Sequence, residues 1–214
     1  MYTLYVYDHC PFCIKARMIF GLKDIPFHLA ILPNDDEQGP ISMVGRKVVP
    51  ILGRDGQFMA ESLDIVARID AEGAPVLAGQ RNPLLGEWMR RSNAPLYRQF
   101  LPRAAAAPFP EFATTSARAY FIGNKERTEE PFSTVLREKH VAIETLNPLL
   151  AELAPLVRAP DAVNGTLSYD DIDLFALLHS FSIIQGLTYP PEVEAYRQTM
   201  SKRCGIPLLD ALAV

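Results

Sequence analysis

The chain has 214 residues and a formal net charge of −4, with 49% hydrophobic and 21% charged residues. This composition can bury a substantial core, which excludes a chain that is disordered throughout. The weakly acidic charge lacks the positive field that nucleic acids or an anionic membrane surface require, so we expect neither as a partner.

Three cysteines are too few, and odd in number, for the disulfide framework of a secreted domain. The N-terminal residues lack the basic start and long apolar run of a signal peptide. No apolar run reaches the length of about 18 residues that a membrane span needs. We therefore expect a cytoplasmic protein, and in that compartment two close cysteines indicate redox or metal chemistry more often than structure.

The first residues predict a strand, a helix and a second strand. Residues 1–7 are rich in tyrosine and valine and favour a strand. Apolar residues then recur at helical spacing through Leu22, Pro26 ends the helix, and residues 27–31 form the next strand candidate. The short crossover implies a right-handed unit with two parallel strands.

The polar residues 33–40 are predicted to form a surface loop. Residues 48–52 and 57–59 flank the turn sequence Arg54-Asp55-Gly56, which indicates a hairpin. Glu61-Ser62 then opens a helix. We expect this α+β unit to occupy residues 1–75, with a linker over 76–84.

Residues 85–214 show helical patterns only, and we expect an all-helical second domain. Its prolines are predicted to mark helix starts and turns, with Asn147-Pro148 opening a new helix after one over residues 132–146. Ser168 and Asp171 have the spacing of a capping box. The helix that follows is apolar nearly all round, which predicts burial.

Cys10-Pro11-Phe12-Cys13 is the most informative motif of the sequence. Cysteines three positions apart on a helical turn have Cα atoms about 5–5.5 Å apart, which suits a disulfide that opens and closes. Cys10, at the helix start, faces unpaired N–H groups that favour the thiolate, whereas Cys13 is more protected. We therefore expect Cys10 to attack a disulfide and Cys13 to resolve the product.

Two other interpretations of the cysteine pair are weaker. A structural zinc site needs four ligands, and the sequence offers no second pair of cysteines, so we expect no metal. Two inert buried thiols would not require a strand-to-helix junction with proline at the first helical position.

Val49-Pro50 and Glu61-Ser62 are candidates for ligand binding. A cis bond before Pro50 would present the backbone N–H and C=O of Val49 to an extended ligand. The helix start at Glu61-Ser62 suits a ligand carboxylate, although it is also an ordinary helix cap.

Together these motifs resemble a glutaredoxin, and the helical remainder is similar to the C-terminal domain of glutathione transferases. The whole chain resembles the large two-domain bacterial glutaredoxins of the glutaredoxin 2 type. The residues that carry this resemblance are Tyr7-Asp8-His9-Cys10-Pro11-Phe12-Cys13, Val49-Pro50-Ile51-Leu52, Glu61-Ser62 and Ala162-Val163-Asn164-Gly165.

The resemblance implies a thioredoxin-like α+β domain followed by an all-α glutathione-transferase-like domain. It implies a monomeric, glutathione-dependent thiol-disulfide oxidoreductase that reduces protein disulfides and glutathione mixed disulfides, with glutathione as the reducing co-substrate. Its catalytic residues would be Cys10 and Cys13, and its glutathione-binding residues would be Pro11, Phe12, Val49, Pro50, Glu61 and Ser62.

The resemblance leaves two features of the glutathione site open. Phe12 stands where glutaredoxins usually carry tyrosine, so a hydroxyl contact to glutathione is lost. Either Arg46 or Lys47 could pair with the glycyl carboxylate. His9 is interpreted as a helix-start or surface residue, and Cys204 as a buried small apolar residue.

Two alternative functions remain on the same fold. A glutathione transferase of the single-cysteine, omega-like kind would have no need of Cys13. A non-catalytic interaction protein, similar to the transferase-like factor that binds RNA polymerase, could dispense with both thiols, but a fold alone does not decide function.

Overall fold

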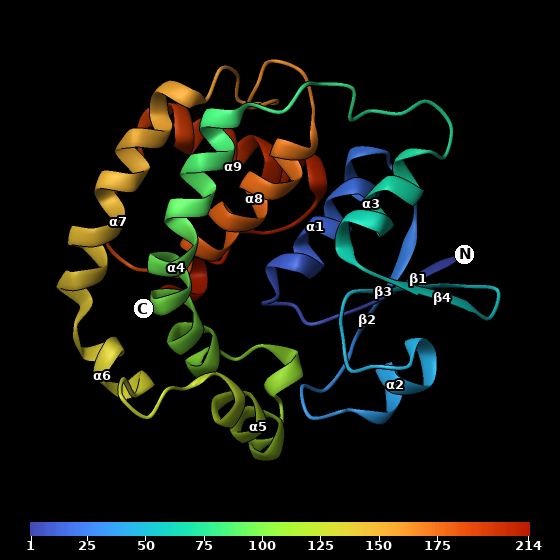
Figure 1. Ribbon diagram of the computed structural model, residues 1–214, viewed down its shortest axis with the longest axis horizontal. Helices are drawn as coiled ribbons and strands as arrows, with labels where there is room; N and C mark the ends of the chain where they lie inside the picture. The colour runs from blue at the N-terminus through green and yellow to red at the C-terminus, as the bar shows by residue number, and fades with distance from the viewer.

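A four-stranded sheet forms the N-terminal part of the protein, in the order β2-β1-β3-β4 (Figure 1). The structure is a computed structural model that describes residues 1–214. Strand β1 pairs in parallel with β2 and antiparallel with β3, as the sequence predicts. The elements of this part are β1 (Tyr2–Val6), α1 (Pro11–Leu22), β2 (Phe27–Ile31), α2 (Gln38–Val44), β3 (Ile51–Arg54), β4 (Gln57–Ala60) and α3 (Ser62–Asp70).

Two details of this part differ from the sequence prediction. Helix α2 begins inside the expected loop, and its end is marked by Gly45 in the left-handed conformation (φ 76°), which glycine adopts without strain. The strand expected from Val48 begins only at Ile51, because Pro50 has no N–H to donate to the ladder. The β3–β4 turn has positive φ at both Asp55 and Gly56, as tight hairpins require.

The remainder of the protein is helical. Its elements are α4 (Pro83–Ala106), η1 (Pro110–Phe112), α5 (Thr115–Lys125), α6 (Phe132–Arg137), α7 (Lys139–Leu153), η2 (Ala154–Leu156), α8 (Tyr169–Phe181), α9 (Pro191–Cys204) and η3 (Asp210–Leu212). Helix α1 packs against α3 on one side and against α8 and α9 on the other, so it links the sheet to the helical part (Figure 1). Lys15 of α1 also forms an ion pair with Asp173 of α8, with Nζ and Oδ1 2.7 Å apart.

The prediction that prolines mark helix starts and turns is wrong at three positions. Pro95 and Pro102 lie inside the continuous helix α4, and Pro148 lies inside α7. Each proline removes one backbone hydrogen bond, but burial of the apolar face of each helix outweighs that loss. The single helix expected over residues 132–146 is instead divided at Glu138 between α6 and α7.

The capping box at the start of α8 is confirmed. Asp171 accepts from the backbone N–H of Ser168 at 2.9 Å, and its other oxygen accepts from the N–H of Val163 at 2.7 Å. The hydroxyl of Tyr196, from α9, also donates to Asp171 at 3.0 Å. Helix α8 is buried on nearly every side, as its apolar sequence predicts. These hydrogen bonds hold the start of α8, the central helix of the second part, in place in addition to its apolar packing.

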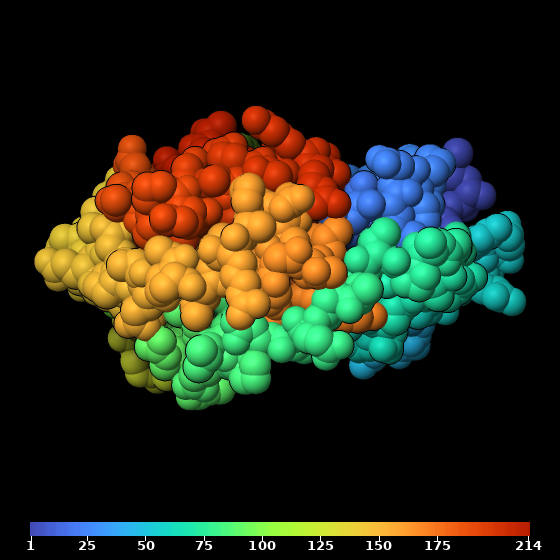
Figure 2. Space-filling view, turned by 90° about the horizontal axis from the view of Figure 1, so that it is seen from above, coloured from blue at the N-terminus to red at the C-terminus, as the bar shows by residue number.

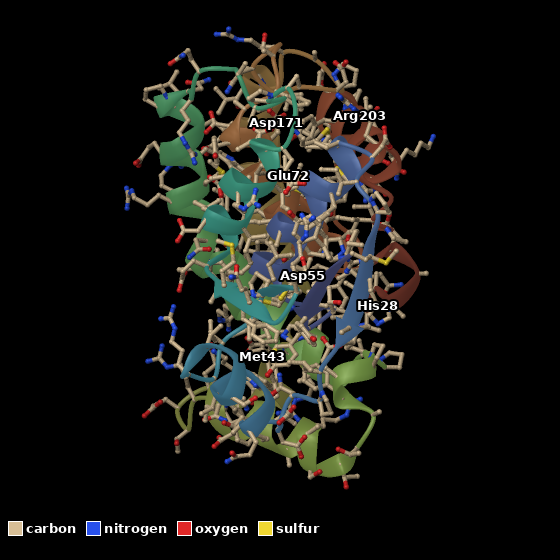
Figure 3. The ribbon with its side chains drawn as sticks, turned by 90° about the vertical axis from the view of Figure 1, so that its right-hand side faces the viewer. His28, Met43, Asp55, Glu72, Asp171 and Arg203 are labelled. Carbon is tan, nitrogen blue, oxygen red and sulfur yellow. The ribbon has the colours of Figure 1, made fainter.

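Apolar side chains from both parts form one continuous buried cluster. The chain passes from α3 to α4 along the surface, where it bridges the two parts (Figure 2). Gly79 in this connection donates to the carbonyl of Leu167 at 2.7 Å, which ties it to the loop before α8. In Figure 3, His28, Met43 and Asp55 mark the sheet part, and Asp171 and Arg203 mark α8 and α9. None of the helices has both the length and the apolar character needed to cross a bilayer.

Candidate active site

Cys10 lies where the turn after β1 enters α1. It is the N-cap residue of the helix, in extended conformation (φ −74°, ψ 120°), and Pro11 is the first helical residue. No side chain caps this helix start, so its first N–H groups have no side-chain partner. Cys10 is half-buried, whereas Cys13, one turn further, is fully buried, and both are free thiols.

The two thiols have opposite shifts of pKa. A hydrogen bond from the Cys13 thiol, aided by the charge of His9 and by backbone N–H groups, outweighs desolvation and lowers the pKa of Cys10 to about 6. Burial, together with the hydrogen bond to Cys10, raises the pKa of Cys13 well above its usual range. At neutral pH the half-buried sulfur is therefore a thiolate and the buried one a protonated thiol.

A cavity of about 470 Å³ opens beside Cys10, between the two parts of the protein. Of the residues proposed from the sequence, Cys10, Pro11, Phe12 and Val49 line it. The remaining lining residues of the sheet part are Tyr7, His9, Asn34, Lys47 and Val48, and those of the helical part are Tyr97, Phe100, Leu101, Tyr120, Phe121, Asn124 and Lys125. The sequence signals identified one wall of this cavity and missed the other.

The bond between Val49 and Pro50 is cis, the isomer that would present the backbone of Val49 to an extended ligand. Pro50 itself is buried and does not line the cavity. Ile51 of β3 is paired with Ala60 of β4, so Val49-Pro50 and Glu61-Ser62 lie at the same end of the hairpin. The sheet thereby brings together two motifs that are eleven residues apart in the sequence.

Glu61 and Ser62 lie at the start of α3, outside the cavity lining. Glu61 is exposed, with φ of 73°, and one of its carboxylate oxygens is 2.5 Å from a guanidinium nitrogen of Arg46. Lys47 does line the cavity: its Nζ donates to the carbonyl of Asn34 at 2.6 Å and lies 3.5 Å from the centroid of the Tyr120 ring. The two cations between which the sequence could not choose therefore have different surroundings.

His9 directly precedes the N-cap of α1, as expected for a helix-start residue, but it is not a surface residue. His9 is only 5% exposed, and its ring lies among the aromatic rings of both parts of the protein. Its ring centroid is 5.1 Å from the Phe112 ring and 5.1 Å from the Phe121 ring. Its Nδ1 is 2.5 Å from Oε1 of Glu111, a residue of η1 in the helical part. A residue adjacent to Cys10 is thus held by the second domain.

The other singled-out residues have structural roles. Cys204 is buried at the end of α9, as expected, and burial raises its pKa to about 12. His179 is buried in α8, and burial lowers its pKa to about 3, so it is uncharged at neutral pH. No cluster of histidine, cysteine and acidic side chains has the arrangement of a metal site.

Comparisons with known proteins show which family has this arrangement. Residues 85–213 match the family model described as glutaredoxin 2, C-terminal domain, and residues 4–76 match that of the glutathione S-transferase N-terminal domain. The chain is 45% identical over 213 residues to glutaredoxin 2 of Escherichia coli K12, covering 99% of each chain. It is also 45% identical to a glutaredoxin 2 from Salmonella typhimurium solved in complex with glutathione, with a TM-score of 0.97 and coverage of 100% and 99%.

More distant structures share the fold alone. Gtt2 from Saccharomyces cerevisiae is 18% identical, with a TM-score of 0.57 over 98% of this chain and 99% of that one. The fold class and the family resemblance drawn from the sequence are confirmed. The chain belongs to the glutaredoxin 2 family, and it is a glutathione-dependent oxidoreductase.

Proposed function

We propose that this oxidoreductase reduces protein disulfides and glutathione mixed disulfides, with Cys10 as nucleophile and Cys13 as resolving thiol. The observation that carries the proposal is the asymmetry of the dithiol. Cys10 borders the cavity at a helix N-terminus with a pKa of about 6, and the protonated Cys13 is buried behind it. A thiolate of low pKa that a disulfide can reach is the nucleophile that thiol–disulfide exchange needs.

The reaction follows from these two protonation states. The Cys10 thiolate attacks one sulfur of the substrate disulfide, forms a mixed disulfide and releases the other sulfur as a thiol. Cys13 then loses its proton, attacks Cys10 and releases the second thiol, which leaves a Cys10–Cys13 disulfide. One glutathione opens that disulfide by joining Cys10, and a second removes the first as glutathione disulfide. The sum is one disulfide reduced and two glutathiones oxidised.

For glutathione we propose a site that runs from Cys10 along the end of the hairpin. The backbone of Val49 would hold the cysteinyl part as an added strand does, with Pro50 fixing the chain beside it. Glu61 and Ser62 at the start of α3 would bind the γ-glutamyl end, whose ammonium group suits the Glu61 carboxylate. The pairing of Ile51 with Ala60 supports this extent, because it sets both motifs at one end of the sheet.

Pro11 and Phe12 would form the floor beside the reacting sulfur. Both line the cavity, and Phe12 is 50% exposed, with the Lys15 ammonium 5.3 Å from the centroid of its ring. Phenylalanine can pack against the aliphatic part of glutathione, although it offers no hydroxyl. The substrate would therefore be held here by contact area and not by a hydrogen bond.

We further propose that the protein works as a monomer in the cytoplasm. The cavity is formed by residues of a single chain, so no partner copy is needed to complete it. A dithiol that is reset by glutathione requires a compartment in which glutathione is kept reduced, and the cytoplasm meets that requirement.

The proposed roles are tested by trapping the intermediate. In Cys13→Ser, glutathione disulfide should leave one glutathione on Cys10, because no second thiol displaces it, and mass spectrometry after acid quenching should detect the adduct. Wild type should instead form the internal disulfide with little adduct. Cys10→Ser serves as the control and should acquire none. An adduct on Cys13, or none in Cys13→Ser, would show that the roles are assigned wrongly.

Lys47 is the cation that we expect to pair with the glycyl carboxylate, since it lines the cavity and Arg46 is engaged by Glu61. Lys47→Ala should raise KM for glutathione roughly three- to tenfold with little change in kcat, as loss of one partly screened ion pair does. Steady-state kinetics with glutathione as the varied substrate measure both constants. Lys139→Ala, at the exposed start of α7, is the matched control. An unchanged KM in Lys47→Ala would assign the carboxylate to another group.

A further inference from the structure

One carboxylate of the helical domain reaches the residue that precedes Cys10. Oε1 of Glu111 accepts hydrogen bonds from the backbone N–H of His9 at 2.9 Å and from its Nδ1 at 2.5 Å. Glu111 and His9 are 102 positions apart in the sequence, and they are 1% and 5% exposed. The backbone and the ring of His9 are therefore fixed by the same oxygen atom, from across the domain boundary.

This arrangement is costly as a structural contact. A buried carboxylate loses its hydration, and a buried ion pair is often no more stable than apolar side chains of the same volume. Oε2 of Glu111 is buried and has no hydrogen-bond partner, so part of that cost is not offset. The surrounding rings of Phe109, Phe112 and Phe121 could have filled the space with apolar atoms alone. A role in the chemistry of the neighbouring Cys10 explains why a charge is kept here.

We propose that Glu111 is a positioning residue of the active site, which through His9 fixes the turn that carries Cys10 and holds the imidazole ring next to its sulfur. The inference rests on the proposed function, because it takes Cys10 to be the nucleophile. It gives the helical domain a part in the reaction, since η1 supplies the group that holds His9.

The charges of the pair act on the two thiols in opposite directions. The charge of His9 lowers the pKa of Cys10, while the charge of Glu111 raises that of Cys13. Burial raises the pKa of Glu111, but the hydrogen bonds and charge of His9 lower it more, so the carboxyl is ionised at neutral pH. His9 thus acts on the nucleophile, and Glu111 acts on the resolving thiol.

The other titratable groups near His9 are two partly buried tyrosines and further residues that line the cavity. Tyr7 stacks on the His9 ring at 6.1 Å, and burial raises the pKa of Tyr7 and raises that of Tyr97, on α4, to about 12, so both are uncharged. The further titratable groups that line the same cavity are Lys47, which follows α2, and Tyr120 and Lys125 of α5. Lys47 is directed to Asn34 and the Tyr120 ring, and the Tyr120 hydroxyl donates to Glu37.

Glu111→Gln tests the inference, because glutamine keeps an oxygen that can accept from both His9 donors but carries no charge. The rate at which iodoacetamide alkylates Cys10 is measured against pH by mass spectrometry. At pH 6 we expect alkylation to slow roughly fivefold relative to wild type, whereas near pH 9 the rates should converge, as a raised thiol pKa requires. His9→Gln should shift the profile in the same direction.

Asp173→Asn is the matched control. It removes another ion pair between α1 and the helical domain, that of Lys15 with Asp173, and should leave the alkylation profile of Cys10 unchanged. A profile in Glu111→Gln identical to wild type, or a loss of activity that is uniform with pH and accompanied by a lower Tm, would overturn the inference. If only this inference is wrong, Cys10→Ser is still inactive. Activity in Cys10→Ser would instead contradict the proposed function itself.

A second measurement needs no variant. In wild type, the ¹⁵N chemical shifts of the His9 ring report its protonation. We expect Nδ1 to carry a proton that is held by Glu111. A His9 ring without a proton on Nδ1 would contradict the inference even if Glu111→Gln failed to fold.

Discussion

Cys10→Ser is expected to abolish turnover, with a loss of at least about a thousandfold. A serine hydroxyl is not ionised at neutral pH, and its oxygen cannot form the mixed disulfide on which the reaction depends. The assay couples glutathione, glutathione reductase and NADPH to the reduction of a small glutathione mixed disulfide. Cys13→Ser should keep this activity, because removal of glutathione from a mixed disulfide needs Cys10 alone, but should lose the reduction of protein disulfides that require the second thiol.

Cys204→Ala is the control for loss of a thiol. Cys204 is buried at the end of α9 and packs as a small apolar residue, so alanine should leave the activity at the wild-type level. Full activity in Cys10→Ser would contradict the proposed mechanism. Equal loss in Cys10→Ser and Cys13→Ser on the small mixed disulfide would instead show that both thiols are needed at every turnover.

The first strand–helix–strand unit could be predicted from the sequence because its signals are local. Tyrosine and valine favour β1, Pro11 starts α1 and Pro26 ends the crossover, so the bounds of β2 match the prediction. The roles of Cys10 and Cys13 follow from the same local geometry, since the helix start determines which sulfur faces the N–H groups. The cis bond at Val49-Pro50 is different, because the motif alone is a weak signal and only the resemblance to glutaredoxins implies that isomer.

Elements that depend on distant contacts could not be predicted in this way. Proline normally interrupts a helix, yet α4 continues through Pro95 and Pro102 because Trp88 and Phe100 bury its apolar face in the common core. Trp88 also donates to the carbonyl of Leu149 at 2.8 Å, which ties α4 to α7 next to Pro148. These contacts join segments about sixty residues apart, and no local sequence pattern predicts them.

The same limit applies to the second wall of the site. Tyr97, Phe100 and Phe121 read in the sequence as apolar residues of helices, and only the fold brings them to Cys10. The burial of His9 cannot be predicted locally, because its partner, Glu111, lies far along the chain. A buried histidine next to a reactive cysteine is a functional signal, but that burial depends on how the helical domain packs against the motif.

The helical domain therefore contributes directly to the structure of the redox site. It covers the face of α1 opposite α3, it supplies one side of the cavity, and it holds His9 through Glu111. A thioredoxin-like domain alone would leave α1 with an exposed apolar face, because Ile14, Met18 and other α1 side chains are fully buried here. The stability of the site and that of the domain interface are for this reason linked through one helix.

Gly21→Ala should reveal that link through a large loss of stability. A Cβ atom at Gly21 of α1 would lie 2.3 Å from the backbone oxygen of Cys204 and 2.6 Å from its Cα, at the end of α9. Backbone atoms cannot move aside as a flexible side chain does, so the two helices must separate. We expect the free energy of unfolding to fall by about 2–3 kcal/mol, as overpacked sites do. Urea denaturation followed by circular dichroism measures the change.

Gly86→Ala and Gly123→Ala are the matched controls, because a Cβ atom at either helical position would meet no atom within 4 Å. Alanine favours helix over glycine, so each control should gain about 0.5–1 kcal/mol where Gly21→Ala loses stability. The opposite sign separates the close approach of α1 to α9 from the general effect of replacing a helical glycine. If Gly21→Ala were as stable as the two controls, α1 and α9 would not be in the contact that joins the redox helix to the second domain.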